Sequence, residues 1–194
     1  MVEEVKKVAL ITGGGTGIGR SAALALQNDG FRVIVCGRRV EPLEETVSLG
    51  ASNKPVIKAI ATDVTNGVSV KSLFSEIENS CGRLDILFNN AGMGAPRVEL
   101  DELAEDAWRH CVDVNLTGSF LCAQAAFKIM KSQSPQGGRI INNGSISAHA
   151  PRPNTIAYTA TKHAITGMTK TIALDGRAYS IACSQLDIGN ADTA

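Results

Sequence analysis

The sequence predicts an α/β protein in which a doubly wound parallel sheet is covered by helices on both faces. Short apolar runs of strand length alternate with longer amphipathic runs of helix length. The apolar runs lack the in–out alternation of half-exposed strands, so we expect strands buried on both faces, as parallel strands are. Polar and glycine-rich motifs follow these runs, where ligands bind in such sheets. The 194 residues are expected to form a single domain.

Six segments are predicted to be strands because each is a short apolar or β-branched run. In order they are Val5–Thr12, Arg32–Cys36, Val56–Thr62, Leu84–Asn89, Gly138–Asn143 and Ile181–Asp187. Five segments between them have helix length and spacing: Gly17–Asp29, Pro42–Leu49, Gly67–Asn79, Asp101–Lys131 and Thr155–Ala178. Weak helix formers interrupt the fourth of these around Asn115, so we expect that helix to bend there.

The first predicted strand leads directly into a glycine cluster, Gly13–Gly19, and an Ala/Leu-rich helix begins within the cluster. Glycines let the backbone adopt positive φ and let a phosphate approach without meeting a Cβ atom. The start of a helix adds unpaired N–H groups and the positive end of its dipole. A tight turn alone would also explain the glycines, but their place between strand and helix indicates a nucleotide-phosphate site.

Tyr158 and Lys162 lie four residues apart in the last predicted helix, so they share a face and can touch. A phenol titrates near pH ~10, too high for proton exchange with an alcohol at neutral pH. A cation ~4 Å away, at an effective dielectric of ~20, would supply about the 4 kcal/mol needed to bring that pKa near neutral. Ser145, in the loop after the fifth strand, could hydrogen-bond the same substrate oxygen. Taken alone the pair could be ordinary surface residues; the glycine motif favours a catalytic pair.

Taken together, these motifs resemble those of the classical short-chain dehydrogenase/reductase family. The resemblance covers almost the whole chain and rests on Thr12-Gly13-x-x-x-Gly17-x-Gly19, Asn89-Asn90-Ala91-Gly92, Asn115, Ser145 and Tyr158-x-x-x-Lys162. It implies a Rossmann-type fold and an NAD(P)-dependent oxidoreductase. Such an enzyme would move a hydride between the cofactor and a ketone, a 3-oxoacyl group or a secondary alcohol.

The same resemblance implies a role for each motif residue. Tyr158 would be the general acid/base, Lys162 would lower its pKa and hold the nicotinamide ribose, and Ser145 would polarise the substrate carbonyl. Asn115 would hold a water that connects Lys162 to solvent. Cofactor contacts are implied at Gly13, Gly15, Thr16, Gly17, Ile18, Gly19, Asp63, Val64, Asn90, Ala91, Gly92, Tyr158 and Lys162. Relatives also suggest a homodimer or homotetramer built through the two long helices.

Cofactor choice is predicted from the end of the second strand. A dinucleotide fold that prefers NAD usually carries an acidic residue there for the ribose 2′-hydroxyl, but from Val35 onward no carboxylate occurs until Glu41. Arg38 and Arg39 instead offer charge-assisted bonds to a 2′-phosphate. NADP(H) is therefore expected over NAD(H), with Arg38 as the main contact and Arg39 as a second. Solvated arginines are the alternative, although at a helix start they would oppose the dipole.

Two departures from the family pattern lie near the end of the chain. Relatives usually carry Pro-Gly and then Thr after the sixth strand, where this chain has Ile188-Gly189 and Thr193. Nicotinamide carboxamide binding is expected to survive through Gly189 and Thr193. Relatives also continue with a substrate-covering lid and a seventh strand, which the 194 residues do not include. We therefore expect the sequence to be part of a longer chain rather than a shortened form.

Composition argues against several other classes of protein. Lys plus Arg and Asp plus Glu number 19 each, so neither a nucleic-acid nor a membrane partner is indicated. No apolar run approaches the ~20 residues of a membrane span, and the acidic start is unlike a signal peptide. Five cysteines without C-x-x-C spacing predict reduced thiols in a cytoplasmic protein. The three histidines show no spacing with them that would predict a metal site.

Two other functions are compatible with parts of the pattern. A non-catalytic NADP(H)-binding sensor or scaffold would need the glycine motif but would not need the proposed proton relay. A nucleotide-sugar epimerase or dehydratase shares Tyr-x-x-x-Lys, but its glycine spacing and longer substrate domain do not occur here. Candidate substrate contacts are Met93–Pro96 and Ala148–Arg152. Of these, His149 could contact substrate or cap its loop, and Arg152 could attract an acidic substrate or be solvated.

Overall fold

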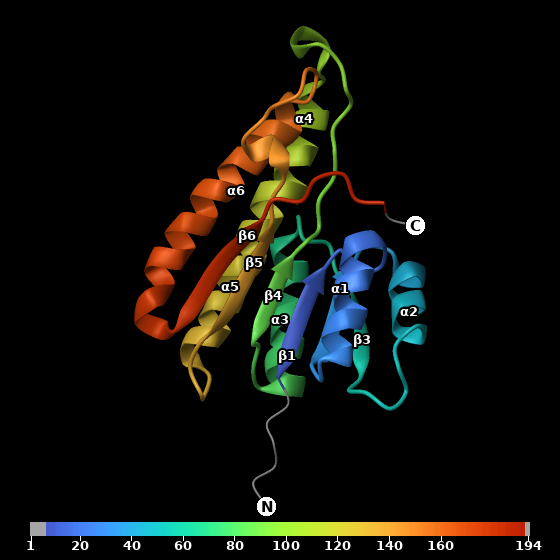
Figure 1. The fold of residues 1–194 in the computed structure, drawn as a ribbon, viewed down its shortest axis with the longest axis vertical. Helices are drawn as coiled ribbons and strands as arrows, with labels where there is room; N and C mark the ends of the chain where they lie inside the picture. Colours follow the sequence, from blue (N-terminus) through green and yellow to red (C-terminus); the bar gives the residue numbers. More distant parts are fainter. Residues whose placement is uncertain (1–6, 193–194) are drawn as a thin grey trace, which may run out of the picture.

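A computed structural model of the chain describes residues 7–192, which form a six-stranded sheet (Figure 1). The strands are β1 (Val8–Thr12), β2 (Arg32–Gly37), β3 (Ile57–Ala61), β4 (Ile86–Asn89), β5 (Gly138–Asn143) and β6 (Ile181–Leu186). Their order is β3-β2-β1-β4-β5-β6, and every neighbouring pair is parallel. The chain winds outward from β1 in one direction and then, after crossing back to β4, in the other. The predicted doubly wound parallel sheet is confirmed, with its switch point between β1 and β4.

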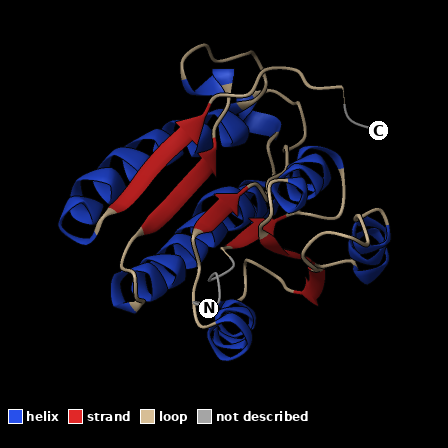
Figure 2. Cartoon of the chain, turned by 60° about the horizontal axis from the view of Figure 1, so that its bottom comes forward, coloured by secondary structure: helices blue, strands red, loops and turns tan. Residues whose placement is uncertain are grey.

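Helices lie on both faces of this sheet (Figures 1 and 2). They are α1 (Gly17–Asn28), α2 (Val40–Ser48), α3 (Gly67–Cys81), α4 (Glu105–Val112), α5 (Gly118–Ser132) and α6 (Ile156–Asp175). The first two pack on one face, over the half of the sheet that contains β1 to β3, and α3 and α5 pack on the other. No helix in the described range is both long enough and apolar enough to cross a membrane.

The central strand β1 shows why the sheet is buried on both sides. Val8 and Leu10 belong to the core cluster under α3 and α5, whereas Ala9 and Ile11 belong to the cluster under α1 and α2. Successive side chains of a strand point to opposite faces, so an unbroken apolar run fills both cores. Burying one such side chain stabilises the fold by about 1.5–3 kcal/mol. This rigid centre fixes the position of the loop that follows Thr12.

The long helix predicted over Asp101–Lys131 begins instead at Glu105, after a short 3-10 turn at Leu100–Glu102. A π-helical turn at Asp113–Thr117 joins α4 to α5 without a break in the helical backbone. In that turn the backbone N–H of Gly118 donates to the carbonyl of Asp113, five residues back, as π turns require. The weak helix formers around Asn115 therefore coincide with one inserted residue in the helix. Similarly, the helix predicted to reach Ala178 ends at Asp175 and continues as a 3-10 turn.

Candidate active site

Two cavities open at the carboxyl edge of the sheet. Their walls come from the loops that follow the strands, since all carboxyl ends of a parallel sheet meet at one edge. The larger has a volume of about 550 Å³ and the smaller about 230 Å³. We call them the nucleotide cavity and the substrate cavity. Thr193, a predicted cofactor contact, lies outside the described residues.

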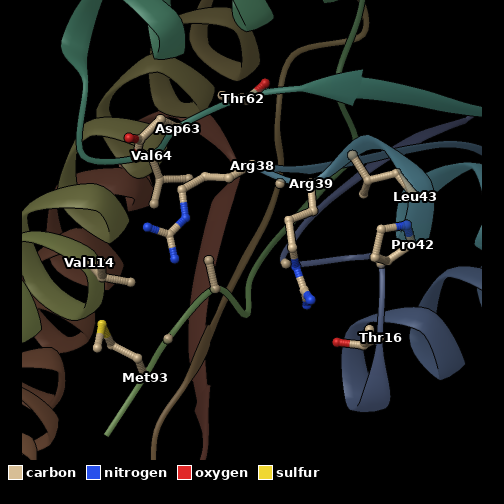
Figure 3. A pocket seen from close by; sticks show the side chains of 15 residues that line it. Thr16, Arg38, Arg39, Pro42, Leu43, Thr62, Asp63, Val64, Met93 and Val114 are labelled. Carbon is tan, nitrogen blue, oxygen red and sulfur yellow. The ribbon is translucent and has the colours of Figure 1, made fainter. Parts of the chain in front are cut away.

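Residues from the loops after four strands, the start of α2 and the π turn form the wall of the nucleotide cavity (Figure 3). They are Gly13, Gly15, Thr16, Gly37, Arg38, Arg39, Pro42, Leu43, Thr62, Asp63, Val64, Ala91, Gly92, Met93 and Val114. Most of the predicted cofactor contacts are therefore brought together here. Gly17, Ile18, Gly19 and Asn90 are not part of this wall.

The glycine loop between β1 and α1 is shaped to receive a phosphate. Gly13 and Gly17 have φ angles of +65° and +53°, which residues with a side chain rarely adopt. A Cβ atom at Gly19 would overlap the carbonyl oxygen of Gly13 and lie 2.6 Å from Nδ2 of Asn90. At the start of α1, Thr16 provides no side-chain cap and the first turn carries no acidic residue. The positive end of α1 is thus free to meet an anion, so these residues fit a dinucleotide pyrophosphate.

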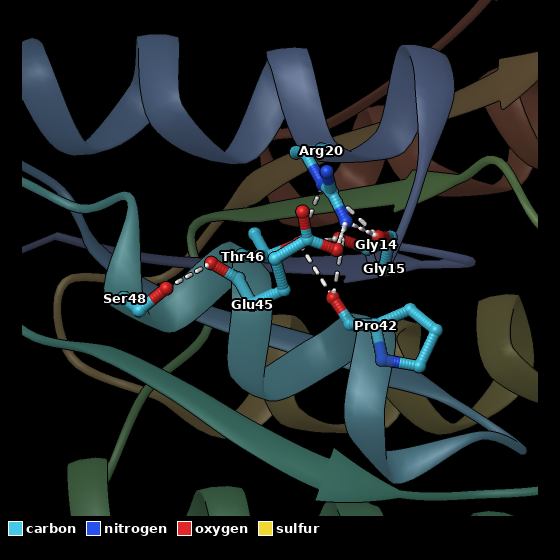
Figure 4. Close-up of polar contacts among 7 residues, drawn as sticks. All are labelled: Gly14, Gly15, Arg20, Pro42, Glu45, Thr46 and Ser48. Atoms are coloured by element: carbon cyan, nitrogen blue, oxygen red, sulfur yellow. Dashed lines mark hydrogen bonds and ion pairs between the residues drawn. The ribbon is translucent and has the colours of Figure 1, made fainter. Parts of the chain in front are cut away.

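Arg20 fixes the glycine loop against α2 (Figure 4). Its Nη2 donates to the carbonyl of Gly15 at 2.6 Å and to the carboxylate of Glu45 at 2.6 Å. Its Nε donates to the hydroxyl of Thr46 at 3.2 Å, and that hydroxyl in turn donates to the carbonyl of Gly14 at 3.0 Å. These bonds therefore hold the glycine loop and α2, the helix that follows Arg38 and Arg39, together as one unit. Sequence reasoning missed Arg20, although it directly follows the glycine motif.

Both arginines after β2 border the nucleotide cavity, and their side chains leave the backbone in different directions (Figure 3). Neither Arg38 nor Arg39 forms an ion pair with a carboxylate of the described chain. The nearby Asp63 is held by the backbone N–H and hydroxyl of Thr65 at 2.9 and 2.8 Å. These hydrogen bonds, the backbone one foremost, lower the pKa of Asp63, and the charge of Arg38 adds to the effect. Among residues 7–192, the wall of this cavity thus includes the engaged carboxylate of Asp63 and two arginines available to a ligand.

A chain of side-chain hydrogen bonds joins the ends of β1, β4 and β5. The hydroxyl of Thr12 accepts from the backbone N–H groups of Asn90 and Ala91 at 3.0 and 2.9 Å. The amide of Asn90 donates back to the Thr12 carbonyl at 3.0 Å and accepts from Asn143 Nδ2 at 3.0 Å. The carbonyl of Asn143 then accepts from Lys162 Nζ at 2.6 Å. Lys162 is therefore anchored to the same strand ends that carry the cavity walls.

Lys162 and Tyr158 lie on one face of α6 and are not turned apart. The ammonium of Lys162 lies 5.5 Å from the centroid of the Tyr158 ring. Lys162 is 5% exposed, and this burial lowers its pKa from 10.5 to about 8. The amine is still mostly protonated at neutral pH and provides a buried positive charge beside the phenol.

Asn115 uses its side chain to hold the loop after β4. Its Oδ1 accepts from the backbone N–H of Met93 at 2.8 Å, and its Nδ2 donates to the Met93 carbonyl at 2.9 Å and to the Thr161 hydroxyl at 3.2 Å. It makes no direct hydrogen bond to Lys162 within the described structure, but the two groups are close. A Cβ atom placed on Gly92 would lie 3.4 Å from Asn115 Oδ1 and 3.9 Å from Lys162 Nζ.

The substrate cavity brings Ser145 and Tyr158 together in one wall. Among the described residues, its wall consists of Gly94, Ala95, Arg97, Ser145, Ile146, Ser147, Arg152, Thr155, Tyr158, Ile188, Gly189 and Asn190. The Ser145 hydroxyl is buried and accepts from the backbone N–H of Ser147 at 3.1 Å. Its own proton is therefore available for another acceptor. The predicted Gly189 also borders this cavity rather than the larger one.

Asp187 supports the Ser145 loop from the end of β6, and sequence reasoning gave it no role. Its Oδ1 accepts from the backbone N–H of Ser145 at 3.1 Å and from Gln185 Nε2 at 2.6 Å. Its Oδ2 lies 2.8 Å from Nε2 of His149, so His149 caps this loop. Burial opposes ionisation of Asp187, but the hydrogen bonds from His149, Gln185 and Ser145 prevail and lower its pKa. No residue between 7 and 192 belongs to a group of three or more potential metal ligands.

Comparisons with known proteins agree with this arrangement. The sequence model of the family described as short chain dehydrogenase matches residues 7–194. A 3β-hydroxysteroid dehydrogenase of Mediterraneibacter gnavus is 34% identical over 188 residues, which are 97% of this chain and 67% of that protein. Acetoin dehydrogenase YohF from Salmonella typhimurium superposes with a TM-score of 0.91 at 32% identity, covering 97% of this chain and 74% of that one.

A second solved structure extends the comparison to another activity. The 3-ketoacyl-(acyl-carrier-protein) reductase from Brucella melitensis, complexed with NADH, superposes with a TM-score of 0.90 at 28% identity, covering 96% of this chain and 76% of that one. These relatives share hydride chemistry at a carbonyl or alcohol but differ in substrate. The chain therefore belongs to the short-chain dehydrogenase/reductase family, and it is an NAD(P)-dependent oxidoreductase.

Proposed function

We propose that this chain is a single cofactor-binding and catalytic domain for hydride transfer between NADP(H) and a small carbonyl or secondary alcohol. Tyr158 is its general acid/base. The observation that carries the proposal is the shared wall of Ser145 and Tyr158, with the buried ammonium of Lys162 5.5 Å from the phenol ring. A hydroxyl donor and a proton-exchanging phenol at one small cavity, with a cation beside the phenol, are what reduction of a carbonyl requires.

The chain's own residues handle the substrate oxygen and its proton. When bound, the dinucleotide supplies or accepts the hydride at its nicotinamide ring. The Ser145 hydroxyl, already bonded by Ser147 N–H, donates its proton to the substrate oxygen and fixes its position. Tyr158 gives its proton to that oxygen in reduction and takes it back in oxidation. The positive charge of Lys162 stabilises the phenolate that reduction leaves behind.

The role of Asn115 is structural, unlike the roles of Ser145, Tyr158 and Lys162 at the substrate oxygen. Its side-chain amide is engaged with Met93 and Thr161. We therefore infer that Asn115 positions the loop after β4, which borders both cavities, and that its bond to the Thr161 hydroxyl ties α6 to this loop beside Lys162. A water held near Asn115 that connects Lys162 to solvent stays a prediction.

NADP(H) is the cofactor that the nucleotide cavity favours. Arg38 and Arg39 border it without an ion pair to any carboxylate of the described chain, so both are available to form charge-assisted bonds to a ribose 2′-phosphate. Oδ1 of Asp63 already accepts two hydrogen bonds from Thr65, and its Oδ2 remains to accept a hydrogen bond from the adenine. The Brucella reductase was solved with NADH, so we argue the preference from the arginines of this chain alone.

Replacing Arg38 by Ala tests the cofactor preference. Loss of a charge-assisted contact costs about 1.5–3 kcal/mol, so the Kd for NADPH should rise roughly 10- to 100-fold while that for NADH changes little. Arg32→Ala is the matched control because Arg32 lies exposed at the opposite end of β2. Both dissociation constants can be measured by fluorescence titration of the reduced cofactors. Equal weakening of both cofactors by Arg38→Ala would refute the assignment.

One assay distinguishes an enzyme from a protein that only binds NADP(H). Absorbance at the reduced-nicotinamide band is followed with NADPH and a panel of small ketones. We expect oxidation of NADPH with at least one ketone. Binding of NADPH without turnover of any carbonyl or alcohol would favour the alternative, a sensor or scaffold that uses the glycine loop alone.

We also propose that the protein is a homodimer or homotetramer. A groove of about 740 Å³ runs between α5 and α6. Its wall includes Phe120, Phe127, Met168, Ile172 and Tyr179. Phe120 is 46% exposed and Leu174, on the same helix pair, is 57% exposed, which is costly for a lone chain. Light scattering tests the assembly, and the mass of a single chain would contradict it.

A cytoplasmic location stays a prediction, supported by the five cysteines, all unpaired.

A further inference from the structure

The substrate cavity contains more positive charge than the hydride chemistry needs. Arg97, in the loop after β4, and Arg152, in the loop before α6, both line it. Among residues 7–192, no Asp or Glu is part of its wall. Two arginines from separate segments therefore border a volume of about 230 Å³.

Neither guanidinium is neutralised by the part of the chain that the structure describes. The ion pairs there involve other basic residues, and Arg152 Nη2 donates only a long hydrogen bond, 3.4 Å, to Oδ1 of Asn190. The nearest acid to the Ser145 loop, Asp187, is already engaged by His149, Gln185 and the Ser145 N–H. It is therefore not available to compensate the arginines.

Like charges that share a small cavity repel each other, and an anion between them removes that repulsion while forming charge-assisted bonds. Guanidinium groups match the planar, two-oxygen geometry of carboxylates and phosphates. A substrate held there would extend from the wall shared by Ser145 and Tyr158 toward the two arginines.

We propose that the substrate is a small oxo or hydroxy compound with an anionic carboxylate or phosphate group, which Arg97 and Arg152 bind. The proposal rests on the carbonyl/alcohol function assigned to the same site. The arginines act as specificity residues: they hold the anionic end, while Ser145 and Tyr158 act on the oxygen that reacts.

Matched pairs of substrates test this with the full chain and saturating NADPH. Acetoacetate and levulinate place a carboxylate at two distances from the ketone, and their methyl esters remove the charge. Dihydroxyacetone phosphate and dihydroxyacetone form the phosphate pair. We expect kcat/KM to be at least ~10-fold higher for the anion in one pair, with the preferred pair identifying the anionic group.

Arg97→Ala and Arg152→Ala should each lower kcat/KM for that anion by roughly 10- to 100-fold and change the neutral partner by less than ~3-fold. Arg177→Ala, which removes one positive charge in the turn after α6, is the control and should leave both values unchanged. Equal rates for anion and neutral partner in every pair, or equal losses for both partners in the arginine variants, would overturn the proposal.

A binding measurement separates failure of this proposal from failure of the catalytic function. If no ketone is reduced, the hydride-transfer function itself fails, and the anion site is judged by calorimetric titration with malonate and with inorganic phosphate. The proposal predicts a binding event that the Arg97→Ala/Arg152→Ala double variant loses and Arg177→Ala keeps. The same titration curve for wild type and double variant would exclude an anion site. Because both arginines are exposed, these variants should fold.

Discussion

Replacing Lys162 by Met is expected to stabilise the free protein while it removes activity. The side chain is 5% exposed, and its ammonium carries a charge that burial disfavours. Met has a similar length and no charge, so it can fill the same space. The site would thus hold a residue that weakens the fold in return for its chemistry, as functional sites often do.

The size of the effect follows from the pKa and the one hydrogen bond. Burial lowers the pKa of Lys162 from 10.5 to about 8, which at ~1.4 kcal/mol per unit is a cost of roughly 3.5 kcal/mol. The 2.6 Å bond from Nζ to the carbonyl of Asn143, which Met cannot form, is worth about 1.5–3 kcal/mol. The variant should therefore gain about 0.5–2 kcal/mol, or about 1–8 °C in Tm for a domain of this size.

The pH dependence of this difference has a definite sign. Between pH 8 and 10.5 the unfolded chain still holds the Lys162 proton that the folded chain has released. The stability of the wild type therefore rises with pH across this interval, and the advantage of Met is full below pH 8 and shrinks toward pH 10.5.

Thermal and urea unfolding at pH 6.5 and pH 9.5 measure both the gain and its pH dependence. Lys170→Met is the control because Lys170 is exposed on the same helix, and it should change the free energy of unfolding by less than ~0.5 kcal/mol. Turnover of the Lys162 variant should fall by at least ~100-fold. A variant less stable than the wild type at pH 6.5, or a difference that does not change with pH, would refute the reasoning.

Two further predictions concern the supports of the two cavities. Gly19→Ala should raise the Kd for NADPH by at least ~10-fold, because the added Cβ would overlap the carbonyl of Gly13 and displace the loop; an unchanged titration curve would count against the phosphate site. Asp187→Ala should release the backbone of Ser145 and lower kcat several-fold while the Kd for NADPH stays the same. If cofactor affinity and kcat fall together, Asp187 supports the whole fold rather than the Ser145 loop.

The sheet could be predicted from sequence because its signals are local. The strand Gly138–Asn143 has the predicted bounds, since its apolar run is flanked by glycines on both sides. The strand predicted at Leu84 begins instead at Ile86. Leu84 exchanges its backbone hydrogen bonds with the amide of Gln133, 49 residues away, and not with a neighbouring strand. No periodicity in the sequence reports such a contact.

The parts of the site that escaped prediction depend on contacts between distant segments. Asp187 reaches Ser145 across 42 residues, and the amide of Asn115 reaches Met93 across 22. Weak helix formers indicated a bend near Asn115, but the inserted residue of a π turn follows from tertiary bonding that spacing alone does not encode. By contrast, four-residue helical spacing places Tyr158 and Lys162 on one face wherever the helix forms.

The central claim, proton exchange by Tyr158, is tested most directly by Tyr158→Phe. The variant removes one hydroxyl and keeps the ring beside Lys162. Single-turnover oxidation of bound NADPH by the best ketone should slow by at least ~100-fold, while the Kd for NADPH stays within ~3-fold of the wild type. Oxidation at the wild-type rate by a variant that binds NADPH normally would contradict the account.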